Sequence, residues 1–277
     1  LLSANHSIQL SGLLGDQLTY FKITASDLGN NSGTYNGEGK LAPAPVIGLM
    51  AEPGNQEVGV VWDESDNVSG YNIYRSSDGG VSYTKANLQI NTERYFHDTA
   101  VVNATTYYYK ISALDIDGNE SILSASLSVT PLALLAGPTI TNGGVITNNS
   151  IWLKSKSPYQ ISANTKIGSG NTLVILPGTS IEFTQPNLNI YVEGNIIAYG
   201  TQTQNILLNV GGLHGEIIVS STNIGTSEFH YVSIDNLSIE LENSGVQAPV
   251  NIFDSTISII NTQVFRPKKV INSTVTC

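Results

Sequence analysis

The sequence predicts an all-β protein in which β-sandwich modules precede a second β-rich domain of a different kind. Short runs of β-type residues, separated by Gly, Asn and Asp turns, recur along the 277 residues. One strand-and-turn segment occurs twice, and helical periodicity is absent from the second half of the chain. Only 12% of the residues are charged, about half the usual share.

The repeated segment links two related modules. YFKITASDLGNNS, from Tyr20, returns as YYKISALDIDGNES from Tyr108, 88 residues later. Both copies alternate apolar and polar side chains for the length of a strand and then break at a Gly-Asn turn. Each copy is therefore expected to form a half-buried strand followed by a hairpin turn.

The second copy closes a complete module, which we assign to residues 41–131. Short strands are expected at 58–62, 71–75 and 107–114, a spacing typical of a β-sandwich. The module resembles a fibronectin type III domain of the bacterial extracellular kind. The segments that carry the resemblance are PAPVIGLMAEP, the following Trp62, GYNIYRS, YYYKISALDIDGNES and the closing SVTP.

The resemblance implies structural roles for two aromatic residues. Trp62 would fill the core between the sheets. One tyrosine of the stretch 107–109, for which we choose Tyr108, would hydrogen-bond back to the backbone. Neither role is catalytic.

Residues 1–40 resemble only the last third of the same module, through IQLSGLLGDQLTYFKITASD. We therefore expect a truncated C-terminal part of a fibronectin type III module and a linker here. Half a sandwich would expose apolar area at roughly 25 cal/mol per Å². This cost suggests that the chain begins inside a longer protein.

Residues 132–277 resemble a right-handed parallel β-helix of exported proteins. The resemblance rests on SPYQISANTKIGSGNTLVILPGTSIEF and on Trp152, a structural residue of the expected first coil. At about 22 residues a coil, this length corresponds to roughly six coils, and the solenoid is expected to be incomplete. A jelly roll or a further sandwich is the alternative for this part.

Charge and composition exclude several classes of protein. There are 12 Lys and Arg against 22 Asp and Glu, and the net charge of −10 would repel nucleic acid. We expect no membrane span, because no stretch of 18 apolar residues occurs. The only cysteine is Cys277, so no internal disulfide can form.

The sequence contains no catalytic constellation that we would assign. Glu240 and Glu242 lie two residues apart on an expected strand and offer a pair of carboxylates such as a glycosidase uses. Two solvated acids on the outer face of a coil are the favoured interpretation. His214 and His230 have no second ligand at zinc spacing. We lean toward a protein that is not an enzyme; as an enzyme it would be a polysaccharide lyase or a glycoside hydrolase.

Asp115, Asp117 and Asn119, in DIDGN, resemble the start of a calcium loop, and Ca²⁺ is the only cofactor that we consider. The glutamate required at the twelfth position is missing, so a hairpin turn is the favoured interpretation. Tyr83, in the turn-rich GGVSYTK, is the best candidate for an exposed ring that stacks on a sugar.

The leading hypothesis for function is a non-catalytic, extracellular structural or adhesive protein of a cell surface, surface layer or filament. Free strand edges would allow it to associate with itself or with other surface proteins. The alternative is an accessory portion of a secreted polysaccharide-degrading enzyme, acting as a spacer or binding polysaccharide. Fold alone does not decide between them.

Overall fold

The computed structural model describes residues 18–26, 32–40, 42–209, 215–219, 227–235, 237–241, 250–253, 256–258, 269–271 and 274–276. The chain divides into two compact units that alternate along the sequence. Unit 1 comprises residues 1–50, 61–96 and 107–128, and unit 2 comprises 51–60, 97–106 and 129–277.

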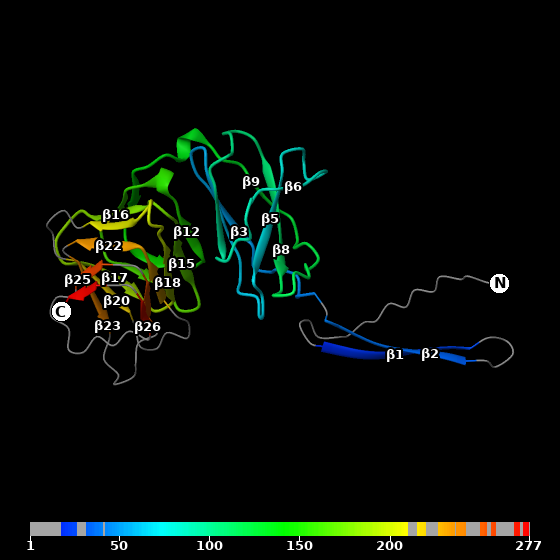
Figure 1. The fold of residues 1–277 in the computed structure, drawn as a ribbon. Coiled ribbons are helices and arrows are strands. Elements are labelled where there is room, and N and C mark those ends of the chain that lie inside the picture. Colours follow the sequence, from blue (N-terminus) through cyan, green and yellow to red (C-terminus); the bar gives the residue numbers. More distant parts are fainter. Residues whose placement is uncertain are drawn as a thin grey trace. The chain divides into compact units, whose positions relative to one another are not determined.

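The expected all-β class is confirmed. The only helices in the described ranges are two 3₁₀ turns of three residues, η1 (Ala133–Leu135) and η2 (Lys154–Lys156). None of the helices found there has the length and apolar character needed to cross a bilayer. The first copy of the repeat forms β1 (Leu18–Ser26), which pairs antiparallel with β2 (Ser32–Lys40) in a separate hairpin (Figure 1).

The complete module forms a three-stranded and a four-stranded sheet, as expected for a fibronectin type III sandwich. The first sheet has the order β3 (Met50–Pro53), β4 (Val58–Val61), β7 (Tyr95–Asp98). The second has the order β6 (Thr84–Lys85), β5 (Gly70–Ser76), β8 (Tyr107–Leu114), β9 (Leu127–Val129). In β8, Tyr107, Tyr109 and Ile111 are buried and alternate with half-buried residues as far as Lys110, as the sequence pattern requires.

The C-terminal part is a parallel β-helix, so the jelly-roll and sandwich alternatives are wrong. Its first sheet contains β10 (Thr139–Thr141), β13 (Tyr159–Ile161), β16 (Ser180–Phe183), β19 (Ile206–Asn209), β22 (Val232–Asp235), β25 (Thr256–Ser258) and β27 (Thr274–Thr276). The second contains β11 (Gly144–Ile146), β14 (Thr165–Ile167), β17 (Leu188–Val192), β20 (Gly215–Val219) and β23 (Leu237–Leu241). The third contains β12 (Ser150–Trp152), β15 (Thr172–Ile175), β18 (Asn195–Tyr199), β21 (Ser227–His230), β24 (Val250–Phe253) and β26 (Lys269–Ile271).

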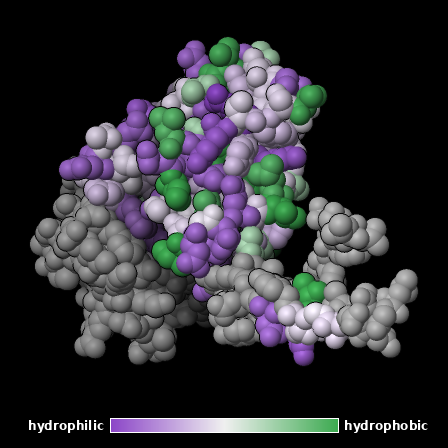
Figure 2. All heavy atoms as spheres, turned by 45° about the vertical axis from the view of Figure 1, so that its right-hand side comes forward, coloured by the Kyte–Doolittle hydropathy of each residue, from purple (hydrophilic) through white to green (hydrophobic). Residues whose placement is uncertain are grey.

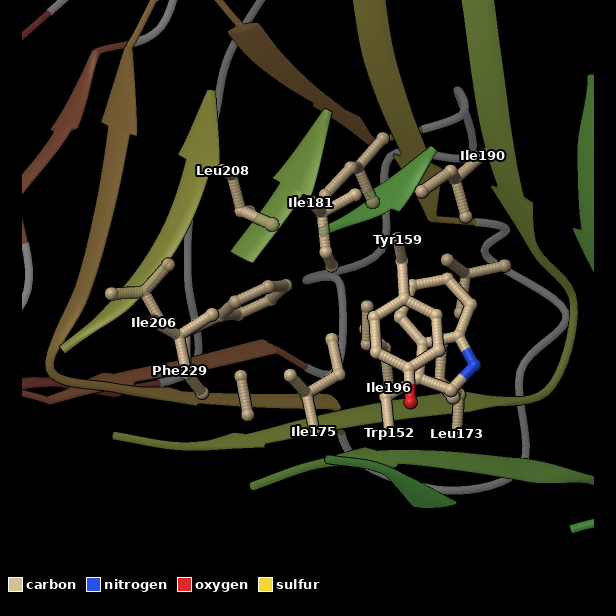
Figure 3. Close-up of a cluster of buried hydrophobic side chains, with 14 of the residues drawn as sticks. Trp152, Tyr159, Leu173, Ile175, Ile181, Ile190, Ile196, Ile206, Leu208 and Phe229 are labelled. Atoms are coloured by element: carbon tan, nitrogen blue, oxygen red, sulfur yellow. The ribbon is translucent and has the colours of Figure 1, made fainter. Parts of the chain in front are cut away.

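Successive coils stack so that apolar residues fall on apolar residues. Tyr159 pairs with Ile181 in the next coil, 22 residues on, and Ile190 pairs with Ile217, 27 residues on. The inward-facing side chains form one continuous core (Figure 3). At the beginning of that core the ring of Trp152 stacks on Tyr159, with centroids 4.3 Å apart and planes 8° from parallel.

Candidate functional site

Unit 2 contains a buried, hydrogen-bonded pair of a carboxylate and a histidine that the sequence analysis missed. Glu57 lies immediately before β4, and His97 belongs to β7. The side chains of His97 and Glu57 are only 10% and 6% exposed, and His97 Nε2 lies 2.7 Å from Glu57 Oε2. Buried charges are uncommon unless they are paired and hydrogen-bonded, so this pair marks a specifically built place in the fold.

A tight turn positions the carboxylate. Gln56 adopts a positive φ of 56°, and Gly54 donates its N–H to the Glu57 carbonyl at 2.9 Å. The following strand, β4, is buried along its whole length and anchors the turn. The side chain of Glu57 thereby points to η2, where its Oε1 accepts the backbone N–H of Ser155 at 2.6 Å.

The surroundings keep Glu57 ionised. Burial acts to raise the pKa of this carboxyl, but the hydrogen bonds from His97 and Ser155 outweigh burial and hold the pKa below its usual range. The carboxylate is therefore charged at neutral pH. Both of its oxygens are engaged, one by an imidazole and one by a backbone N–H, which suits a fixed joint rather than a group that exchanges protons with a substrate.

Further polar contacts surround the pair. The hydroxyl of Ser155 accepts the N–H of Asn55 at 2.9 Å, and Lys156 forms a salt bridge with Glu52. We name these contacts, together with the Glu57–His97 and Glu57–Ser155 contacts, the polar joint. Three of these contacts connect residues about 100 apart in sequence, between 51–60 and the beginning of the β-helix. The fourth, Glu57–His97, connects residues 40 apart and leads to β7.

A glycine permits the close approach of β4 to the β-helix within unit 2. A Cβ at Gly59 would lie 2.6 Å from Leu176 Cδ1 and 2.7 Å from Leu153 Cδ2. Real Cβ contacts are not that short, so a side chain at position 59 would not fit. Leu153 and Leu176 of the β-helix pack directly against the Gly59 backbone. The polar joint thus lies beside a tightly packed apolar contact.

The three residues expected to be structural lie in strands or at strand ends. Trp62 is 4% exposed and packs edge-on against Tyr71, with centroids 5.2 Å apart. Trp152 is 7% exposed in the β-helix core. Tyr108 is half-buried, between the buried Tyr107 and Tyr109, and lies on the opposite side of β8 from them.

The calcium candidates form a hairpin turn. Asp115 is 1% exposed, and its Oδ1 accepts the N–H groups of Asp117 at 2.9 Å and Asn119 at 2.8 Å. Its Oδ2 accepts the side-chain amide of Asn119 at 2.8 Å. In the described part of the chain, no group of three or more His, Cys, Asp or Glu side chains is arranged to hold a metal ion. Calcium binding at DIDGN stays a prediction.

Replacing Asp115 with alanine should destabilise the sandwich by about 1–3 kcal/mol, because the backbone N–H groups of Asp117 and Asn119 lose their acceptor. Urea unfolding in the presence of EGTA measures the loss. The matched control is Asp117→Ala, whose side chain is exposed at the tip of the same turn. If calcium raises the melting temperature of the unmodified protein, the loop is an ion site and not only a turn.

The other candidate residues do not come together. His230 lies 3.3 Å from Glu228 on the same strand, and its ring lies 5.5 Å from that of Tyr199. Glu240 belongs to β23, opposite Ile218. His214 and Glu242 lie outside the described residues. Tyr83 is half-buried.

The fold places the chain among modular all-β proteins, with a fibronectin type III sandwich followed by a parallel β-helix.

No protein-family model matches the chain. The chain is 39% identical over 95 residues to an amylopullulanase of Thermoanaerobacter thermohydrosulfuricus, covering 34% of this chain and 6% of that protein. It is 31% identical over 134 residues to exoglucanase B of Cellulomonas fimi, covering 47% of this chain and 12% of that protein.

Two solved structures are also similar. A Fn3-like protein from Clostridium thermocellum is 28% identical, over 32% of this chain and 91% of that chain, with a TM-score of 0.28. A β-1,2-glucanase from Parabacteroides distasonis is 24% identical, over 37% of this chain and 16% of that chain, with a TM-score of 0.29. The chain spans only a small part of the curated relatives, which are polysaccharide-degrading enzymes. They favour the alternative hypothesis, an accessory portion of such an enzyme, over the self-assembling surface protein.

Proposed function

We propose that this chain is a non-catalytic, extracellular accessory portion of a secreted polysaccharide-degrading enzyme, acting as a spacer that faces carbohydrate. The observation that carries the proposal is identity of 39% to 42% with three amylopullulanases over stretches of 89 to 96 residues. A stretch of that length corresponds to one sandwich module. In this proposal the modules are residues 41–131 and 132–277, preceded by part of another module in 1–40.

The polar joint supports a spacer that is stiff within unit 2. A flexible linker would have few contacts across it, whereas residues 51–60 contact the first coil through Glu57, Asn55 and Glu52. Directional hydrogen bonds and an apolar contact at Gly59 restrict the rotation of one part against the other. A stiff spacer keeps neighbouring domains of an enzyme at a fixed distance.

The surface of the chain suits a neutral partner. A net charge of −10 would repel acidic polymers, including nucleic acid and uronate-rich polysaccharides. Neutral polysaccharides carry no charge and are recognised by hydroxyl hydrogen bonding and ring stacking.

Two measurements on the purified chain test the proposal. We expect no release of reducing ends from pullulan or from cellulose, because the chain supplies spacing and not chemistry. We also expect monomers in light scattering across a concentration series and no regular fibres in negative-stain electron microscopy. Hydrolysis would make the chain an enzyme, and fibres or lattices would restore the hypothesis of a self-assembling surface protein.

A further inference from the structure

One side of the four-stranded sheet in unit 1 carries tyrosine, lysine and carboxylate side chains instead of core residues. Strand alternation places Tyr71 and Ile73 in the core and Asn72 and Tyr74 on the opposite side. The register then brings Tyr74 opposite Lys110, Asn72 opposite Ser112, and Ser76 opposite Tyr108. We name this surface the tyrosine face, and define it by Asn72, Tyr74, Tyr83, Tyr108, Lys110 and Glu120.

Glu120 is held in place on the tyrosine face. Its Oε1 accepts hydrogen bonds from the Asn72 amide at 3.0 Å, from the Tyr74 hydroxyl at 2.7 Å, and from the Ser112 hydroxyl. Burial acts to raise the pKa of Glu120, but these hydrogen bonds and the nearby Lys85 charge hold it below its usual range. The result is an ionised acceptor of fixed position on a residue that is itself exposed.

The side-chain amide of Asn72 has one hydrogen-bonding atom without a partner. Asn72 is 5% exposed, and its Oδ1 is buried with no hydrogen-bond partner among the residues that the structure describes. A buried polar atom without a partner costs free energy, and such atoms occur preferentially where a ligand or water completes the bonding. The side chain that carries the unused acceptor contacts Glu120 and lies on the side of the sheet that carries the tyrosine face.

Two tyrosine rings lie near each other on the same face because a glycine leaves room for them. A Cβ at Gly80 would lie 3.1 Å from the Tyr83 hydroxyl and 3.5 Å from Tyr108 Cδ1. The Tyr83 hydroxyl is 2.8 Å from the Ser126 hydroxyl, and Lys110 Nζ lies 4.7 Å from the Tyr83 ring centroid. Both rings are half-buried, so they are fixed and still accessible.

This combination fits a sugar. A pyranose ring has an apolar C–H face that packs on an aromatic ring, and hydroxyls that hydrogen-bond to carboxylates, amides and ammonium groups. Ordering these side chains costs little free energy on binding, because Tyr83 and Glu120 are already held by their neighbours. On the face of the molecule drawn in Figure 2, hydrophobic residues lie scattered among hydrophilic ones.

We propose that the tyrosine face binds a neutral glucan chain, with Tyr83 and Tyr108 stacking on sugar rings and Glu120 accepting hydroxyl hydrogen bonds. This inference rests on the proposed function, since the neutral glucan is chosen by the chain's likeness to glucan-degrading enzymes and by its net charge of −10.

Affinity electrophoresis of the full chain in native gels that contain pullulan, or separately hydroxyethyl cellulose, tests the inference. We expect at least one of the two glucans to retard the unmodified protein. Tyr83→Ala and Tyr108→Ala should each weaken binding about tenfold, by loss of a stacking ring. Tyr191→Ala is the matched control, because Tyr191 is a half-buried tyrosine in the β-helix; its binding should equal that of the unmodified protein.

Glu120→Gln is a second variant that keeps the size of the side chain. We expect it to weaken glucan binding while the tryptophan fluorescence of the chain stays native, which separates a binding effect from misfolding. The inference would be overturned if neither glucan slows the unmodified protein. It would also be overturned if the unmodified protein and all three tyrosine-face variants were slowed equally. Neither result would affect the proposed accessory role, which fails on hydrolysis or fibre formation instead.

Discussion

Replacing Trp152 with alanine is expected to lower the free energy of unfolding of unit 2 by about 3–5 kcal/mol. Trp152 is 7% exposed and stacks on Tyr159 at the start of the β-helix core, so the truncation leaves a cavity that rigid coils cannot close. The lost partner also frees the Tyr159 ring, whose hydroxyl accepts the Leu153 N–H at 2.9 Å. Urea unfolding followed by far-UV circular dichroism measures the change.

Val145→Ala is the control for Trp152→Ala. Val145 belongs to β11 of the same first coil, but it is 55% exposed. Its replacement should change the free energy of unfolding by no more than about 0.5 kcal/mol. Similar losses in both variants would mean that the first coil does not depend on the stacked pair.

Replacing Glu57 with alanine is expected to lower the free energy of unfolding by about 3 kcal/mol at pH 7. The change removes the acceptor of both His97 and the Ser155 N–H, at a place where water has little access. Chemical denaturation at fixed pH measures the loss. Glu64→Ala is the control, because the Glu64 side chain is 76% exposed in its salt bridge with Arg94, and exposed pairs contribute about 0–1 kcal/mol.

The effect of Glu57→Ala should depend on pH in a direction that the lowered pKa fixes. A carboxyl whose pKa is lower in the folded than in the unfolded state stabilises the fold above the unfolded value, here 4.5. That stabilisation disappears as the pH falls through the folded pKa. The difference between the unmodified protein and Glu57→Ala should therefore be largest at neutral pH and shrink as the pH falls below 4.5. A difference independent of pH would show that packing, and not charge, makes Glu57 important.

The sequence predicted the strands well because a strand's side-chain pattern is local. The alternation around Tyr108 gave β8, its earlier copy gave β1, and the stacked coils were expected from residues 157–183. The sequence could not decide between a surface protein and an enzyme's accessory portion, because the same fold serves both. Likeness to curated enzymes favoured the second, which the residues alone had ranked lower.

The sequence by itself determined that the chain is all-β, with a β-sandwich module followed by a solenoid. Only the tertiary structure decided which distant residues meet. Glu57 and His97 are 40 positions apart, and Asn72 reaches Glu120 across 48. Such partners are selected by strand register and by loop closure, which act between segments and leave no periodic signal along the chain. The polar joint and the tyrosine face are for that reason properties of the fold.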